Sequence, residues 1–540
     1  MTTDTTYTIG IDFGSDSVRS ILVDTATGKC IAEYTHNYTR WGHQMYCDPS
    51  ISQFRQHPSD YLEGMEIVIR EVVSLCPSPD AIKSISIDST SSTPCIVDSS
   101  LTPLCMLDEY RENPDAMFIL WKDHTAESEA VLINKHIGSA KENYARHTGG
   151  YYSAECFWAK ILHVLKHSPE LKKKAFTAVE LCDWTTAQLT GVTNAQELRS
   201  SLCAAGSKKM WAEEWGGYPP LEFFESFAKQ LTPIARNLPG KVYDCTKSAG
   251  NLCRDWAIKT GLTTDVVIGI GNIDAHSGAV GAGIAEGTMA LNLGTSSCYM
   301  AVMKDKSFRR KMIDGIFGQV YGSILPGMTG FEAGMSAFGD IFAWIERMHR
   351  WSFGDLNIPE VEELKHNTLS RFTEEAMKIE PDISLPLATD YLNGRRSPSP
   401  DSKLKATVTG LTLSTTPAQV FYALAEAAAF GTKAIIEHLS ANGVKIVKLV
   451  AVGGITHKSP FIMQMLADVT GRELEVSASN QSCALGAAIN ASVACGLHKN
   501  VEEAQKAMCP PAETAYKPNR SRRDILLERY HKYLKLSKIK

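Results

Sequence analysis

Two similar glycine turns, one in each half of the chain, are the first features that could bind phosphate. The segment IGIDFGSDSVRS contains Asp12, Gly14 and Ser15, and the later segment ALNLGTSSCYM contains Gly294 and Thr295. Successive backbone N–H groups in such turns form an anion-binding concavity. One such turn alone is more simply an ordinary β-hairpin. The pair favours a nucleotide polyphosphate held between two halves of a duplicated architecture.

The carboxylate of Asp12 would repel a bare phosphate placed beside the first turn. A cation between them removes this conflict. Mg²⁺ prefers hard oxygen ligands and bridges phosphate oxygens in phosphoryl-transfer enzymes. The sequence therefore predicts that Asp12 organises Mg²⁺, through water.

A second carboxylate, Asp274, follows a predicted strand in GIGNIDAHSGAVGAG. Open α/β sheets bind their ligands at such strand ends. Phosphoryl transfer to an alcohol requires a group that accepts the hydroxyl proton, and aspartate can do this. The alternative is that Asp274 only caps the helix that follows. The residues alone leave both interpretations open.

A glycine pair in VAVGGITHKSPFIMQMLADVTG, Gly453 and Gly454, follows another predicted strand. Glycine lets a flat ring or a phosphate lie directly against the backbone. Gln464 and Asp468 then share one face of the next helix. A simple strand-to-helix turn is the alternative.

Polar and aromatic side chains that would suit a sugar occur in three further segments. Trp121 and Asp123 lie together in ILWKDHTA, Glu332 lies between glycines in GFEAGM, and Lys208 lies in AAGSKKMW. Glu332 would bind a ligand or cap a helix, and a solvated surface lysine is the default for Lys208. A metal-ligand role is not expected for His124, because no second histidine lies at helical ligand spacing.

The elements that must position these residues alternate along the chain, which predicts an α/β fold. The segment from about 351 to 405 reads as a loop-rich insertion, and the last helix is expected to dock on its own domain. The predicted strands include Tyr7–Phe13, Ile82–Asp88, Val266–Ile270, Gly287–Leu293 and Lys448–Val452, and the predicted helices include Asp60–Ser74, Pro417–Leu439 and Arg523–Leu536.

The composition narrows the class of protein. With 540 residues, two or three domains are expected, and a net charge of −5 gives no reason to expect nucleic acid as a partner. No apolar run is long enough to span a membrane, and MTTDTTYTIG lacks the features of a signal peptide. The 14 cysteines, without a C-x-x-C pair, indicate reduced thiols in a cytoplasmic protein without structural zinc.

Taken together, these motifs resemble the FGGY carbohydrate kinases, and within that family the bacterial L-ribulokinases. The resemblance runs from Tyr7 to the helix near Ala484–Ser492, and LWKDHTA with GNIDAH is its most specific part. It implies two actin-like (ribonuclease H-like) domains with a catalytic cleft between them. Residues 1–283 would form the sugar-binding domain and residues 284–540 the ATP-binding domain.

The resemblance also implies a role for each motif. Asp274 matches the catalytic base and Asp12 the carboxylate that organises Mg²⁺. Lys208 and Glu332 match residues that contact a ketopentose, with Ser91 beside the same site, which overturns the surface-lysine interpretation. The residues matching nucleotide contacts are Gly14, Ser15, Gly294, Thr295, Gly453, Gly454, Gln464 and Asp468.

The implied reaction is MgATP-dependent phosphorylation of L-ribulose at its 5-hydroxyl, giving L-ribulose 5-phosphate in L-arabinose catabolism. Ser91 replaces the alanine of a close relative, which leaves the fine sugar preference open. The nearest alternative is a kinase for D-ribulose, xylulose or ribitol. A non-sugar actin-like ATPase and an inactive sugar sensor are further alternatives. A homodimer is the general expectation for soluble oligomers.

Overall fold

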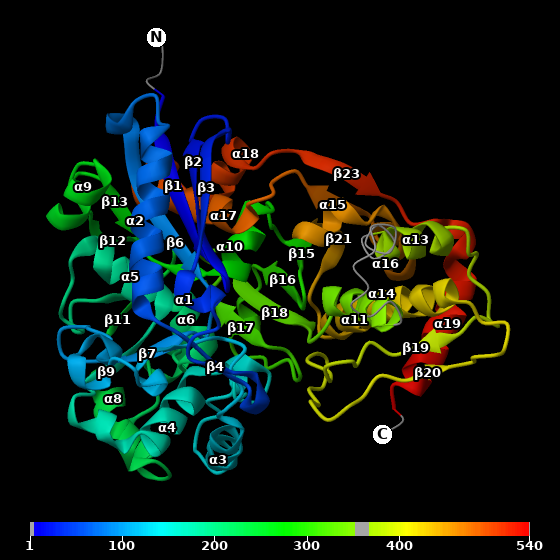
Figure 1. Ribbon diagram of the computed structural model, residues 1–540, viewed down its shortest axis with the longest axis horizontal. Helices are drawn as coiled ribbons and strands as arrows, with labels where there is room; N and C mark the ends of the chain where they lie inside the picture. Colours follow the sequence, from blue (N-terminus) through cyan, green and yellow to red (C-terminus); the bar gives the residue numbers. More distant parts are fainter. Residues whose placement is uncertain (1–4, 352–366, 539–540) are drawn as a thin grey trace.

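The computed structural model describes residues 5–351 and 367–538, which contain two large mixed sheets side by side (Figure 1). The first sheet has the order β12-β13-β6-β1-β2-β3, with β14 paired to β6. Its strands are β1 (Tyr7–Phe13), β2 (Ser17–Asp24), β3 (Cys30–Asn37), β6 (Ile82–Ser89), β12 (Ser248–Asn251), β13 (Val267–Gly269) and β14 (Asn272–Ile273).

The second sheet repeats the central arrangement of the first, in the order β17-β18-β16-β15-β21-β22-β23. In each sheet the first strand pairs antiparallel with the next strand and parallel with a later one. The duplicated architecture predicted from the two glycine turns is therefore present. The strands are β15 (Gly287–Leu293), β16 (Ser297–Met303), β17 (Gly318–Tyr321), β18 (Thr329–Met335), β21 (Ile446–Val452), β22 (Leu474–Ser477) and β23 (Ala512–Tyr516).

Helices cover the sheets and form the rest of each core. In the first half these include α2 (Pro58–Ser74), α3 (Glu127–Ile137), α4 (Phe157–His167), α5 (Leu181–Thr190), α6 (Leu202–Lys208), α9 (Arg254–Thr260) and α10 (Asp274–Gly281). The later helices include α11 (Gly339–Arg350), α13 (Thr368–Ala376), α14 (Pro417–Ala441), α15 (Gly454–Lys458), α16 (Pro460–Thr470), α17 (Ser482–Ala494), α18 (Val501–Met508) and α19 (Arg523–Leu536).

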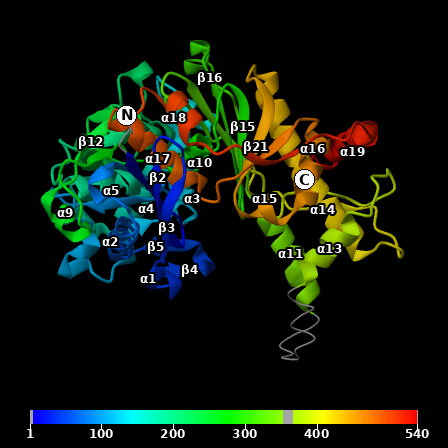
Figure 2. The ribbon, with the colours of Figure 1, turned by 90° about the horizontal axis from the view of Figure 1, so that it is seen from above.

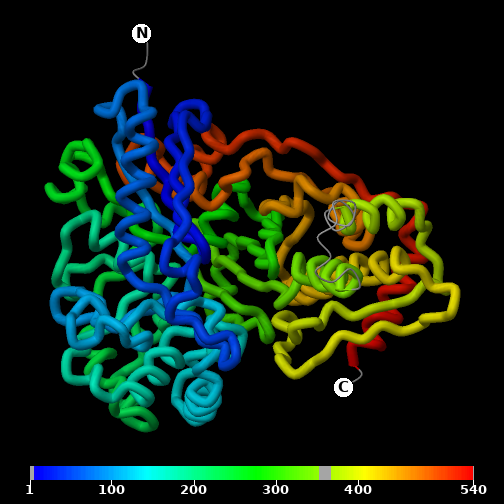
Figure 3. The backbone as a smooth tube through the Cα atoms, viewed as in Figure 1, coloured from blue at the N-terminus to red at the C-terminus, as the bar shows by residue number. Residues whose placement is uncertain are grey.

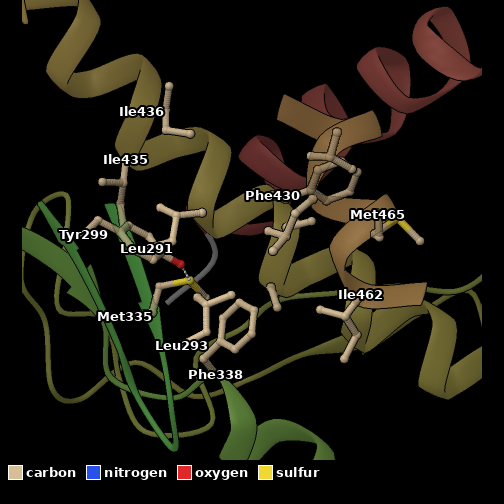
Figure 4. Close-up of a cluster of buried hydrophobic side chains, with 14 of the residues drawn as sticks. Leu291, Leu293, Tyr299, Met335, Phe338, Phe430, Ile435, Ile436, Ile462 and Met465 are labelled. Carbon is tan, nitrogen blue, oxygen red and sulfur yellow. Dashed lines mark hydrogen bonds between the residues drawn. The ribbon is translucent and has the colours of Figure 1, made fainter. Parts of the chain in front are cut away.

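The core of the second half is built on α14, which is buried along most of its length. Leu291, Tyr299 and Met335 from the sheet lie on the same side of this helix as Ile435, and Phe430 lies on its other side, where its ring contacts Tyr533 of α19 (Figure 4). The Tyr299 hydroxyl donates to the sulfur of Met335 at 3.3 Å. Burial of this apolar surface, at roughly 25 cal/mol per Å², holds the helix on the sheet.

Helix α17 comes late in the chain but packs on the first sheet, between β1 and β6 on one side and α10 on the other (Figures 1 and 2). Because strand side chains alternate, Thr8, Gly10 and Asp12 share the face toward α17, while Ile9 and Ile11 face the apolar core on α2. A Cβ on Gly10 would lie 1.8 Å from the Ala484 carbonyl oxygen. The helix therefore lies almost in backbone contact with the sheet.

Residues 352–366 of the predicted insertion lie outside the described residues, and the remainder is only partly loop. After α13, the short strands β19 (Leu387–Ala388) and β20 (Val408–Thr409) enclose a long loop. Buried Arg529 on α19 pairs with Glu426 and donates to the Asp382 carbonyl oxygen at 2.7 Å. The predicted docking of α19 on its own half is confirmed. Among the described residues, no helix is long and apolar enough to cross a membrane.

Candidate active site

A cavity of about 180 Å³ lies where the two halves meet, and side chains from both halves form its wall. It brings together predicted residues that are far apart in the sequence. Those lining it are Ser15, Ser91, Trp121, Lys208, Asp274, Gly294, Thr295 and Glu332.

Asp274 is the first residue of α10, directly after β14. The N-cap position belongs to Ile273, and Asp274 follows it as the first helical residue. Its Oδ1 accepts a hydrogen bond from the Ala275 N–H at 2.6 Å. Burial, and then the negative charge of Asp12, raise the pKa of Asp274 to about 7. A carboxyl with this pKa exchanges protons readily near neutral pH, as a general base requires.

Asp12 lies beside Asp88, which the sequence analysis did not select as a site residue. The two are partners in the parallel pair β1–β6, and Asp88 is also the partner of Asn272 on β14. Neither carboxylate oxygen of Asp88 has a hydrogen-bond partner within the described part of the chain. Burial, then the charges of Asp12 and Asp274, raise the pKa of Asp88 well above its usual range. In the sequence, the only feature that marked Asp88 as a possible site residue was its place at the end of a predicted strand.

Arg19, on the strand that returns from the first turn, pairs with Asp12 at 3.2 Å. Burial raises the pKa of Asp12, although Arg19 acts in the opposite direction. The two buried carboxyl groups of Asp12 and Asp88 therefore resist ionising together, and a single arginine only partly offsets this. Carboxylate oxygens of this kind suit Mg²⁺. The described residues contain no cluster of three or more His, Cys, Asp or Glu side chains that could hold a metal ion.

Each glycine turn is closed by a backbone hydrogen bond from its glycine, which spans three residues in the first turn and two in the second. The Gly14 N–H donates to the Ser17 carbonyl oxygen at 2.9 Å, and the Gly294 N–H donates to that of Ser296 at 3.0 Å. Ser15 also accepts a side-chain hydrogen bond from the Trp121 indole N–H at 3.0 Å. The start of α11 holds the second turn in place. The N–H groups of Phe338, Gly339 and Asp340 donate to the carbonyl oxygens of Gly294 and Thr295. The first turn is therefore held by Trp121 of the cavity wall, and the second turn by the start of α11.

Glu332, which also lines the cavity, lies between two cationic side chains. Its Oε2 is 3.2 Å from His276 Nε2 and 3.8 Å from Lys208 Nζ. Burial alone would raise the pKa of Glu332, but Lys208 and His276 outweigh it and hold the pKa at about 2. Lys208 is only 6% exposed, so the surface-lysine interpretation is wrong.

His276 extends this network behind the cavity. Its Nδ1 lies 2.9 Å from the sulfur of Cys203. Burial lowers the pKa of His276, but Cys203 and Glu332 raise it to about 10. A protonated His276 therefore fixes the orientation of Glu332.

The wall near Ser91 and Trp121 is held by buried charges. Ser91 donates to Glu180 Oε2 at 3.2 Å, and Lys160 donates to the carbonyl oxygens of Ser92 at 2.7 Å and Trp121 at 3.4 Å. These contacts hold the Ser91 and Trp121 segments against each other.

Asp123 does not line the cavity, although the sequence places it beside Trp121. It is fully buried, pairs with Arg55, and accepts hydrogen bonds from the Phe54 N–H at 2.7 Å and the Thr125 hydroxyl at 2.6 Å. These contacts occupy its carboxylate and indicate a structural role.

The predicted nucleotide residues of the second half divide into two groups. Gly453 has φ of 105°, and a Cβ there would lie 2.4 Å from the Leu293 carbonyl oxygen, so this glycine lies directly behind the second turn. Gly454, which begins α15, faces open space. Gln464 and Asp468 instead hydrogen-bond to each other at 2.7 Å, and both hold the segment after β23 through Lys517 and Asn519. They do not line the cavity.

The cavity residues that were not predicted from the sequence include Glu155, Phe317 and Arg396. Arg396 lies in the predicted insertion, yet its Nη2 pairs with Glu155 Oε1 of the first half at 3.0 Å. The guanidinium carbon is 4.5 Å from the centre of the Phe317 ring. No local pattern marks these residues, because they belong to three segments that only the fold brings together.

Comparison with known proteins identifies the family. The N-terminal domain of the FGGY family of carbohydrate kinases matches residues 7–281, and the C-terminal domain matches residues 289–495. A protein named "Ribulokinase" from Vibrio parahaemolyticus is 40% identical, with 98% of this chain and 95% of the relative covered. A "Ribulokinase" from Halalkalibacterium halodurans is 34% identical, with coverage of 98% and 94%.

Solved structures of xylulose kinases share the fold. That from Rhodospirillum rubrum has a TM-score of 0.79 at 19% identity and covers 98% of both chains. A ligand-bound xylulose kinase from Lactobacillus acidophilus has a TM-score of 0.80 at 19% identity, with 98% of this chain and 97% of that chain covered.

Proposed function

The chain belongs to the FGGY family of carbohydrate kinases, and from this premise we propose that it transfers the γ-phosphoryl group of ATP to the 5-hydroxyl of L-ribulose. Relatives of similar length and sequence that are named ribulokinase support ribulose as the sugar. The observation that carries the proposal is one cavity lined by Asp274, Lys208 and Glu332 together with residues of both glycine turns.

In the proposed mechanism, the turn backbone and hydroxyl groups hold the polyphosphate. Lys208 donates to a sugar oxygen, and Glu332, ionised and fixed by His276, accepts from a sugar hydroxyl. Asp274 accepts the proton of the 5-hydroxyl as that oxygen attacks the γ-phosphorus, the bond from the γ-phosphorus to the β,γ-bridging oxygen breaks, and ADP leaves. Closure of the two halves over the sugar would exclude water, which otherwise competes as the phosphoryl acceptor.

The proposed Mg²⁺ site uses Asp12 and Asp88. The unpartnered oxygens of Asp88, next to the carboxylate of Asp12, fit a hard cation whose remaining ligands are water and phosphate oxygens. When bound, Mg²⁺ would supply neutralisation of charge on the transferring group.

The proposed division of labour follows the two sheets. All strands of the first sheet precede residue 283 and all strands of the second follow residue 284. We propose that residues 1–283 contribute most sugar contacts and residues 284–540 most ATP contacts. A cytoplasmic homodimer completes the proposal, and the free cysteines suit a reducing compartment.

A sugar panel tests the proposed function. Initial rates with MgATP would be measured for L-ribulose, D-ribulose, L-xylulose, D-xylulose and ribitol, with the position of the phosphate determined by NMR. We expect the highest kcat/KM for L-ribulose and phosphate on its fifth carbon. A higher kcat/KM for another ketopentose or for ribitol would replace L-ribulose as the substrate, and no turnover of any sugar would refute the proposed reaction.

A further inference from the structure

The loop between β19 and β20 carries Arg396 from the second half of the chain to the cavity. Its tip is closed by reciprocal backbone hydrogen bonds between Arg395 and Asp401, at 2.9 and 2.8 Å. The tip packs on Gly315, where a Cβ would lie 2.4 Å from the Ser399 nitrogen. The Gly315 N–H in turn donates to the Gly149 carbonyl oxygen of the first half at 3.0 Å. The loop, yellow in Figure 3, is therefore anchored where the two halves meet.

The side chain of Arg396 is held in one orientation. Its Nη2 donates to both Glu155 oxygens, at 3.0 and 3.1 Å, and its guanidinium lies over the Phe317 ring. The side chains of Arg396 and Glu155 are 11% and 19% exposed. Burial would raise the pKa of Glu155, but Arg396 and then His124 hold it well below its usual range. Glu155 is thus a permanent anion that orients the guanidinium.

One edge of this guanidinium is unused by the protein. Nε and Nη1 of Arg396 have no hydrogen-bond acceptor among residues 5–351 and 367–538, while both Arg396 and Glu155 line the cavity that contains Asp274. Arginine offers five N–H donors and no acceptor. A ligand that satisfies the unused edge must therefore present oxygen acceptors, as a polyhydroxy ketone does.

Building on the proposed function, we propose that Arg396 is a sugar-binding residue. Its free N–H groups donate to a carbonyl or hydroxyl oxygen of an open-chain ketose, and Glu155 acts as the positioning residue. The sugar site then includes a cation from the second half, so the insertion contributes to sugar specificity. Because Arg396 and Lys208 come from different halves, the sugar makes its full set of contacts only when the halves are together.

Kinetic constants of paired variants test this proposal. Arg396→Gln should raise the KM for L-ribulose about tenfold to a hundredfold, the loss expected for one charged hydrogen bond, and change the KM for MgATP less than about twofold. Glu155→Gln should raise the sugar KM by a smaller factor, because the guanidinium loses its orientation and not its donors. Arg309→Gln is the matched control, since Arg309 pairs with Glu213 and Glu214 across the same two halves, at 2.7 and 2.9 Å, outside the cavity.

The outcomes separate a binding role from a structural one. If Arg396→Gln raises the sugar KM no more than Arg309→Gln, the pair only joins the halves and the inference is wrong. If Arg396→Gln fails to fold, Arg396→Lys provides the test. Lysine keeps the ion pair with Glu155 but lacks the planar set of N–H donors of arginine. An unchanged sugar KM in Arg396→Lys would therefore also overturn the proposal. Failure of the wild type to phosphorylate any sugar would instead refute the proposed function and this inference with it.

Discussion

At the scale of single residues, Asp274 combines position and proton affinity. It lies on the cavity wall at the start of α10 with a pKa raised to about 7. We expect Asp274→Asn to lower kcat by roughly 10²- to 10⁴-fold, because general-base catalysis is lost. The affinity for ATP, measured by equilibrium titration, should change little. Near-normal turnover in this variant would remove Asp274 from the role of base.

The raised pKa of Asp274 also predicts a pH dependence. The base acts only when deprotonated, so kcat/KM for the sugar should fall as pH decreases through the pKa and level off above it. The apparent pKa should be about 7 or lower, because Mg²⁺ beside Asp12 would offset one of the charges that raise it. A profile measured from pH 5 to 9 checks this. Glu332, with a pKa of about 2, and His276, with a pKa of about 10, stay charged across that range.

The carboxylate pair of Asp12 and Asp88 predicts a Mg²⁺-dependent effect. Asp12→Ala and Asp88→Asn should each weaken nucleotide binding in the presence of Mg²⁺, and neither should weaken binding in the presence of EDTA. Calorimetric titration of ADP under both conditions measures this without turnover. If the affinities of Asp88→Asn equal those of the wild type under both conditions, Asp88 is only a buried neutral acid.

At the scale of elements, the position of α17 depends on glycine. A Cβ on Gly486 would lie 1.8 Å from the Ser277 carbonyl oxygen, so α17 and α10 touch through backbone atoms. Alanine normally stabilises a helix interior relative to glycine. Here we expect Gly486→Ala to destabilise the protein by about 1–3 kcal/mol through overpacking. Gly42→Ala, whose Cβ would meet nothing within 4 Å, is the control.

Urea unfolding curves of the two glycine variants give the comparison. A midpoint lowered in Gly486→Ala and unchanged in Gly42→Ala supports backbone contact as the cause. An equal or higher midpoint in Gly486→Ala would mean that α10 and α17 separate easily.

At the scale of the whole molecule, the proposed sugar-binding residues and residues of both glycine turns line one cavity between two halves. We therefore expect L-ribulose together with a non-hydrolysable ATP analogue to contract the protein, measured as a smaller radius of gyration by small-angle X-ray scattering. Asp274→Asn should contract in the same way, because it loses proton transfer and not binding. An unchanged radius for the wild type would show that the halves do not close on their ligands.

The local sequence was sufficient to predict those features that lie within one strand, one turn or one helix. β1 spans Tyr7–Phe13 as predicted, and a hairpin turn is present at both Gly14 and Gly294. α14 extends from Pro417 to Ala441 around the predicted apolar run. The position of Asp274 at the end of a strand could also be predicted from the sequence, because a strand followed by small residues indicates the start of a helix.

The tertiary structure alone decided which charges meet. Asp123 is fully buried with Arg55 and not exposed to a ligand, while Gln464 and Asp468 hold a neighbouring segment. Arg396 reaches the cavity from a segment that carries no motif. Partner choice for a buried charge depends on which chain segments approach within a few ångströms, and spacing along one sequence does not contain that distance. The sequence was therefore sufficient to predict the chemistry, but it did not predict which residues line the cavity where the sugar is proposed to bind.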